Sequence, residues 1–176
     1  MVSNGHFSFM YLSTKYYSFA IILSIRNGIY ISDTLITNHH HMASIDELRA
    51  ERIKKLEALT ASGKMGYPAS STRTHEMSSI LTNFSVLESS QEKVIVTGRV
   101  MSSRGQGAIA FIDLYDGSAR MQVVIKLPES TEEVMNFYRE YVDTGDFIEI
   151  TGTVFVTKSG QQSILVSNVT MLSKSL

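Results

Sequence analysis

Three side chains that could contact single-stranded nucleic acid lie close together in the middle of the sequence. Arg104 offers a guanidinium group, Phe111 an aromatic ring, and Gln122 an amide that can both donate and accept hydrogen bonds. Together such groups supply phosphate contacts, a stacking surface for bases and a means of reading base edges. An exposed phenylalanine on a strand is more often a packing residue, so the hypothesis requires a fold that places all three on one face.

The segment that carries these residues has the pattern of a β-hairpin. Two alternating runs rich in β-branched residues flank a short polar stretch that contains Asp116 and Gly117, which is a strong hairpin signal. Because side chains alternate across a strand, we expect Arg120, Gln122 and Val124 on the outer face beside Phe111. The residues predicted to face the core are Ala110, Ile112, Leu114, Met121, Val123 and Ile125.

The flanking sequence predicts three more strands and one helix. Strands are expected over 93–103, 146–157 and 162–172, and a helix over 130–141 with a cap at Ser130. Gly98 suggests a bend or bulge in the first strand, and Ile148, Ile150, Val154 and Val156 are expected to point inward. The predicted fold is mainly β with helices: a five-stranded OB-fold Greek-key barrel, whose face of strands two and three binds oligonucleotides. It is favoured over an open α+β sheet.

An amphipathic helix is predicted before the barrel. Ser44 and Glu47 form a capping box, and Gly63 ends the helix. A second short helix is expected over 75–84, followed by a loop at 89–91. The apolar residues predicted to be buried are Ile45, Leu48, Ile53, Leu56 and Leu59 in the first helix, and Met77, Ile80, Leu81 and Phe84 in the second.

Composition limits the classes of function. The formal net charge of the 176 residues is −1, and residues 93–176 carry eight Lys or Arg against nine Asp or Glu. Nucleic-acid binding must therefore depend on a local patch. The absence of cysteine excludes disulfides, thiolate catalysis and cysteine zinc sites, and favours an intracellular protein.

Residues 1–41 differ from the rest of the chain. They are rich in Tyr, Phe, Ile and Ser, and their apolar stretch is too short to span a bilayer. We expect 1–41 to be a leader that is disordered or not part of the native protein, with Met42 as the biological start. Three consecutive histidines near its end fit a flexible loop or a tag better than a metal site. The expected domains are a helical extension at 42–92 and the OB-fold at 93–176.

From Met42 onward the sequence resembles the N-terminal anticodon-binding domain of class II lysyl-tRNA synthetases. The resemblance rests on Arg52-Ile53-Lys54-Lys55-Leu56, Gly66-Tyr67-Pro68, Arg73-Thr74-His75, Gly98-Arg99-Val100-Met101, the stretch from Arg104 to Gln122, the run from Gly152 to Gly160, and Leu172-Ser173-Lys174-Ser175-Leu176. It implies that Phe111 stacks on an anticodon base and that Arg104 and Gln122 read the central uridine of tRNA-Lys. Gln161 stands where the family usually has the glutamate implicated in recognising the first anticodon base.

The resemblance does not extend to the catalytic half of that family. No catalytic, cofactor-binding or metal-binding residue is predicted: Gly105-Gln106-Gly107 is too short for a phosphate loop and precedes a strand. Asp113 and Asp116 are interpreted as turn and surface residues. We expect the chain to bind tRNA without aminoacylating it. The parent enzyme is implied to be a cytoplasmic homodimer, without membrane association, that uses ATP and magnesium.

Other functions fit the same residues. The Arg104, Phe111 and Gln122 pattern is shared with aspartyl- and asparaginyl-tRNA synthetases, so an anticodon domain of that type is the nearest alternative. A stand-alone OB-fold could bind single strands with little sequence preference. A third possibility is an OB-fold whose outer face, with Phe111, binds protein. The anticodon bound, or the failure to bind nucleic acid, distinguishes these hypotheses.

Overall fold

The chain divides into two units, Met1–Met42 and Ala43–Leu176. The computed structural model describes residues 21–25 and 28–32 of the first unit and 44–176 of the second. In the first unit β1 (Ile21–Ile25) pairs with β2 (Gly28–Ser32) in antiparallel orientation. The expectations for the rest of the leader, including the three histidines, concern residues outside this description.

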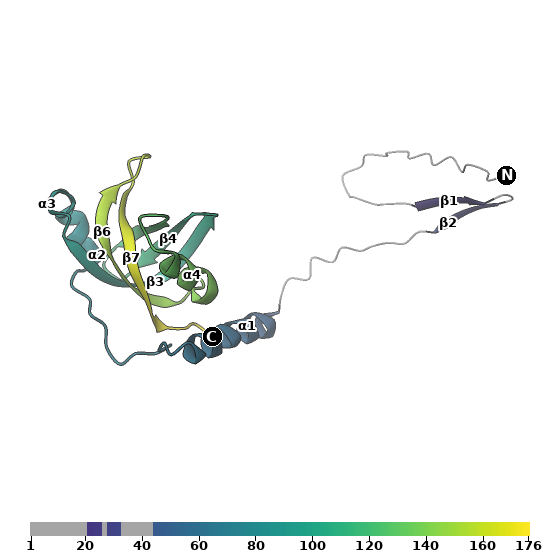
Figure 1. The fold of residues 1–176 in the computed structure, drawn as a ribbon, viewed down its shortest axis with the longest axis horizontal. Coiled ribbons are helices and arrows are strands. Elements are labelled where there is room, and N and C mark those ends of the chain that lie inside the picture. Colours follow the sequence, from purple (N-terminus) through teal and green to yellow (C-terminus); the bar gives the residue numbers. More distant parts are fainter. Residues whose placement is uncertain (1–20, 26–27, 33–43) are drawn as a thin grey trace. The chain divides into compact units, whose positions relative to one another are not determined.

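The second unit is built around a closed five-stranded barrel with the strand order β3-β4-β5-β7-β6 (Figure 1). All neighbouring strands are antiparallel except β5 and β7, which pair in parallel and close the barrel. One helix lies between the third and fourth strands of the barrel, so the predicted mainly β OB-fold order is confirmed. The strands are β3 (Lys93–Gln106), β4 (Ile109–Tyr115), β5 (Arg120–Lys126), β6 (Phe147–Val156) and β7 (Gln162–Ser173).

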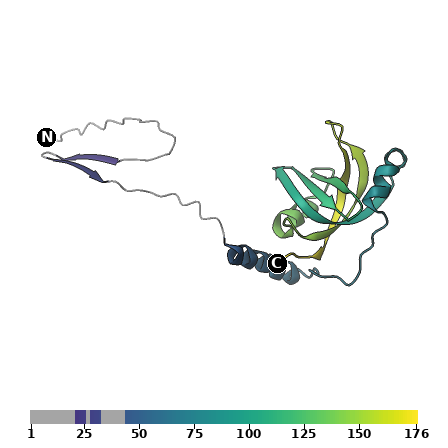
Figure 2. The same ribbon diagram turned by 180° about the vertical axis from the view of Figure 1, so that it is seen from behind.

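Helices lie on opposite sides of the barrel. Figure 2, the view from behind, agrees with Figure 1 that α2 and α3 lie on one side while α4 lies on the other. The predicted capping box at the start of the first helix is confirmed, because Ser44 Oγ accepts from Glu47 N–H at 3.2 Å and Glu47 accepts from Ser44 N–H at 2.7 Å. The helices are α1 (Ile45–Ala61), α2 (Met77–Thr82), α3 (Phe84–Ser90) and α4 (Glu132–Tyr141).

Four details of the helices were predicted wrongly. The second predicted helix is two helices separated at Asn83, and α3 includes Ser89 and Ser90, which were expected to lie in a loop, and ends before Gln91. In α1 only Leu59 is buried, while Ile45 is 83% and Leu48 53% exposed. The cap of α4 is Thr131, because the hydroxyl of the buried Ser130 instead donates to the Val166 carbonyl at 2.6 Å.

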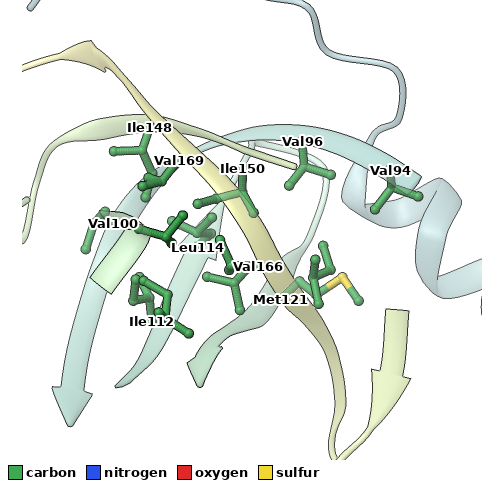
Figure 3. Packing of buried hydrophobic residues seen from close by; sticks show 14 of the residues in the cluster. Val94, Val96, Val100, Ile112, Leu114, Met121, Ile148, Ile150, Val166 and Val169 are labelled. Carbon is green, nitrogen blue, oxygen red and sulfur yellow. The ribbon is translucent and has the colours of Figure 1, made fainter. Parts of the chain in front are cut away.

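The barrel interior is filled by the alternating apolar residues of its strands (Figure 3). All six residues predicted to face inward from the hairpin are buried: Ala110, Ile112, Leu114, Met121, Val123 and Ile125. Val124, expected outside, is also buried, on the outer face of β5 between its register partners Phe111 and Leu165. Val156, expected inside, is 43% exposed because it is the last residue of β6.

The bulge in β3 lies after Val100 rather than at Gly98. The register with β4 shifts between Val100 and Ser102. Gly98 is instead a point of close approach, since a Cβ there would lie 3.2 Å from the Tyr115 carbonyl oxygen. Gly152 is tighter still: a Cβ would lie 2.2 Å from the Leu165 carbonyl oxygen. Strand packing therefore requires glycine at position 152, whereas a side chain at position 98 would need its neighbours to shift by a few tenths of an ångström.

A buried ion cluster fastens the C-terminal segment to the barrel. The ammonium group of Lys174, whose side chain is 1% exposed, lies 2.7 Å from a carboxylate oxygen of Asp146 and 2.5 Å from one of Asp143. It also donates to the Tyr141 carbonyl at 2.7 Å. Arg52 of α1 donates to the Ser175 carbonyl at 2.9 Å. The cluster thus links α1, the segment before β6 and the end of the chain.

Candidate nucleic-acid interface

Three rows of side chains cross the strands on the outer face formed by β3, β4 and β5. Cross-strand neighbours on such a face lie close enough for their side chains to touch, so each row is a potential contact line. The Phe111 row contains Arg104, Phe111 and Val124; the Gln122 row contains Ser102, Asp113 and Gln122, with the buried Ser163 of β7 beside Gln122; the Tyr115 row contains Arg99, Tyr115 and Arg120, with Phe147 of β6 beside Arg99.

The half-buried ring of Phe111 forms a pair with Arg104. The two residues are register partners on β3 and β4, and the guanidinium carbon lies 5.5 Å from the ring centroid. This distance allows a cation–π contact. Gly105, next to Arg104, has no room for a side chain because a Cβ would lie 2.6 Å from the Ile109 carbonyl oxygen. The close approach of the two strands fixes the position of the pair.

Barrel closure brings Gln122 beside the turn that carries Gln161. The Gln122 amide donates to Ser163 Oγ at 3.4 Å, and Ser163 Oγ donates to the Gln161 carbonyl at 3.2 Å. The turn is held by Thr157, whose N–H donates to the same carbonyl at 2.9 Å and whose hydroxyl accepts from Gln161 N–H at 3.0 Å. The bond of Gln122, at 3.4 Å, is longer than an ordinary N–H···O hydrogen bond, so its amide can exchange this partner for a ligand at little cost.

All four predicted site residues line one pocket of about 280 Å³ on the outer face. The pattern of alternation was enough to place three of them, and the parallel pairing of β5 with β7 adds Gln161. The residues that line the pocket are Ser102, Arg104, Phe111, Ile112, Asp113, Arg120, Met121, Gln122 and Gln161. Its composition offers guanidinium groups, an aromatic ring, amides, a hydroxyl and one carboxylate.

Asp113 is a pocket residue that the sequence interpretation treated as ordinary surface. It is the register partner of Ser102 on one side and Gln122 on the other. The alternation of side chains along the strand, which places Asp113 on the same face as Phe111, could have identified it as a pocket residue. A carboxylate here accepts hydrogen bonds and repels phosphate, so the Gln122 row suits base edges better than the RNA backbone.

Asp116 acts in the turn, as predicted. Its carboxylate accepts from the N–H groups of Met77 at 2.8 Å, Ser118 at 2.8 Å and Ala119 at 3.0 Å. Burial acts to raise the pKa of Asp116, but the hydrogen bonds from Met77, Ser118 and Ala119 together outweigh it and hold the pKa below its ordinary value. The residue therefore fixes the β4–β5 turn against α2.

A larger pocket of about 540 Å³ lies elsewhere, along α4 and β7. Its walls are mainly apolar, and Lys64 at its edge lies 5.0 Å from the Phe137 ring centroid and 3.6 Å from a Glu133 carboxylate oxygen. No predicted site residue lines it.

Among residues 21–25, 28–32 and 44–176 no group of three or more His, Asp or Glu side chains could hold a metal ion. Within the same ranges, no helix has the length and apolarity needed to cross a membrane.

Comparison with protein families identifies the barrel. Residues 94–172 match the tRNA anticodon family, described as an OB-fold nucleic acid binding domain. Over these residues the barrel is similar to this family. The match spans the five strands and α4 almost completely, and therefore includes the pocket and all three rows on the outer face of the OB-fold.

Curated relatives of the chain are lysine–tRNA ligases. The chain is 37% identical over 145 residues to the enzyme of Clostridium botulinum strain Loch Maree, which covers 82% of the chain and 28% of the relative. It is 35% identical over 133 residues to that of Roseiflexus sp. strain RS-1, covering 75% and 27%. For Clostridium tetani the identity is 38% over 132 residues, covering 74% and 26%. The chain thus spans little more than a quarter of the length of these relatives.

Proposed function

We propose that the barrel recognises the anticodon of tRNA-Lys through the pocket on its outer face. The observation that carries the proposal is the arrangement of Arg104, Phe111, Gln122 and Gln161 around one pocket. The similarity of the chain to lysine–tRNA ligases supports this choice of tRNA. The nearly neutral chain favours recognition of specific bases over attraction to any phosphate backbone.

Each pocket residue has a role in this proposal. Phe111 stacks on an anticodon base, and Arg104 stabilises the stack and contacts the adjacent phosphate. Gln122 pairs its amide with the carbonyl and imino groups of the central uridine. A cytidine presents an amino group and an unprotonated N3 instead, so the amide would have to reverse its donor and acceptor to pair with it. Gln161 hydrogen-bonds the first anticodon base without the charge of a glutamate.

The proposal extends to the protein in which this barrel acts. We infer a cytoplasmic, homodimeric lysine–tRNA ligase that attaches lysine to tRNA with ATP and magnesium, in which residues 42–92 are a helical extension of the barrel at 93–176 and residues 1–41 are a leader outside the functional part. Catalysis belongs to the remainder of that enzyme, while this chain contributes tRNA binding and no cofactor site. Support for this extension is the identity to the curated relatives alone.

A titration of the full chain with fluorescently labelled anticodon stem-loops tests the proposal. Two loops are compared: the lysine anticodon and the same loop with its central uridine replaced by cytidine. Phe111→Ala should weaken binding, whereas the control Tyr67→Ala should not, because Tyr67 is 52% exposed but lies outside the pocket. Equal affinity for the two loops would refute anticodon reading and indicate a general single-strand binder. Failure to bind either loop would favour a protein partner.

A further inference from the structure

The Tyr115 row repeats the arrangement of the Phe111 row at the other side of the pocket. Tyr115 and Arg120 are register partners on β4 and β5, and the Arg120 guanidinium carbon lies 5.8 Å from the Tyr115 ring centroid. The corresponding distance in the Arg104–Phe111 pair is 5.5 Å. Each pair therefore presents an aromatic ring with a guanidinium group, which is a combination suited to stacking a base and contacting its phosphate.

The two rings cannot serve the same base. Phe111 and Tyr115 lie on the same face of β4, and four residues of strand separate them by about 13 Å, whereas stacked rings have centroids within about 7 Å of each other. The Gln122 row, with its hydrogen-bonding groups, lies between them. Because an OB-fold binds about 4 to 16 nucleotides, a strand that stacks on Phe111 has further bases to place along this face.

The ring of Tyr115 is accessible and held in position. It is 40% exposed, and its hydroxyl donates to the Gly117 carbonyl at 3.2 Å in the β4–β5 turn. Charge favours an anionic strand here, because Tyr115 has Arg99 and Arg120 as register partners on both neighbouring strands. The nearest turn carboxylate, Asp116, is already occupied by three backbone N–H groups.

We propose that Tyr115 and Arg120 form a second nucleotide-stacking site, which takes a base of the bound single-stranded RNA other than the one on Phe111. This inference rests on the proposed function, since it describes where the bound anticodon loop lies on the outer face of the barrel. The strand would run along β4 from Phe111 across the Gln122 row to Tyr115. Base edges would face the Gln122 row, where Asp113 disfavours phosphate, and the arginines at each end would contact the backbone.

Binding of the full chain to the lysine anticodon stem-loop tests this site through four variants. Tyr115→Ala should lower affinity by about 5- to 100-fold, the usual loss of one base stack. Tyr115→Phe keeps the ring and should retain most of the affinity, and Tyr67→Ala, which removes an aromatic ring that is 52% exposed and outside the three rows, should bind like the unchanged chain. The chain contains no tryptophan, so Tyr115→Trp introduces a single tryptophan whose fluorescence RNA should quench.

Stem-loops with one abasic nucleotide locate the base concerned. At one loop position, different from the one that responds to Phe111→Ala, removal of the base should abolish the difference between Tyr115→Ala and the unchanged chain. If Phe111→Ala weakens binding but Tyr115→Ala does not, or if Tyr67→Ala weakens it as much as Tyr115→Ala, the second site is refuted and the proposed function stands. If the unchanged chain binds no loop, both are refuted.

Discussion

Replacement of Lys174 by methionine should cause a large loss of stability. Methionine is long enough to fill the space of the lysine chain but leaves the carboxylate of Asp146, which is 0% exposed, without its cation. Removing one partner of a buried ion pair costs about 3 to 5 kcal/mol of unfolding free energy. Asp146 keeps the N–H groups of Asp143 at 2.7 Å and Ser175 at 2.9 Å, so we expect a loss of about 3 kcal/mol, at the lower end of that range.

Lys55→Met is the matched control for this substitution. Lys55 also pairs with Asp143, at 2.5 Å, but its side chain is 32% exposed and that of Asp143 25%. An ion pair with this much solvent contact contributes no more than about 1 kcal/mol. Urea unfolding at pH 7, followed by far-ultraviolet circular dichroism, gives the free energy of unfolding of both variants and of the unchanged chain.

A double variant, Lys174→Met with Asp146→Asn, separates two contributions to the loss of stability. One is the loss of the ion pair, and the other is the cost of a buried carboxylate without a cation. Because asparagine leaves no buried carboxylate without a cation, the double variant should be more stable than the sum of the two single losses predicts. The reasoning would be refuted if Lys174→Met lost no more stability than Lys55→Met. It would also be refuted if the two losses in the double variant were additive.

Three other substitutions test the fold and the outer face. Phe111→Ala should change the unfolding free energy by less than about 1 kcal/mol, because the ring lies outside the core; a collapse of the melting temperature would show that it supports the fold. Asp116→Asn should be less stable than the unchanged chain at pH 7. Because the pKa of Asp116 is lowered in the folded state, its carboxylate stabilises the fold at pH values above the ordinary pKa of 3.8, and this stabilisation is lost as the pH falls through the lowered pKa. The difference in unfolding free energy between the unchanged chain and the variant, measured by urea titration, should therefore shrink at acidic pH. A difference that stays constant with pH would contradict this. Gly152→Ala should cost about 1 to 3 kcal/mol, because its Cβ would lie 2.2 Å from the Leu165 carbonyl oxygen; an unchanged urea midpoint would show that the strands can separate there without cost.

Local sequence patterns predicted the parts of the fold that depend on neighbouring residues. Alternation in the hairpin identified its core residues and put Phe111 outside, and the Ser44–Glu47 capping box marked the start of α1. These features follow from the geometry of one strand pair or one helix turn. The order of strands and helix then limited the barrel to few topologies.

Features that depend on distant contacts were missed. Val124 is buried because β7 pairs beside β5, which no pattern within β5 indicates. The position of the bulge in β3 depends on its two partner strands. The sequence pattern predicted it at Gly98, whereas it lies between Val100 and Ser102. Ile45 and Leu48 share a helical face with Leu59, yet they extend past the barrel and stay exposed, because periodicity does not specify how much of a helix finds a partner.

The parallel seam between β5 and β7 has a thermodynamic consequence. It consists of three residue pairs, and Gln122 lies in the first of them, with Gln161 just before β7. A molecule that contacts both glutamines binds only the closed barrel. Such a ligand at 100 times its dissociation constant adds about 2.7 kcal/mol to the free energy of unfolding. A ligand that binds across the seam therefore stabilises the closed barrel, and a substitution that opens the seam should weaken binding of that ligand.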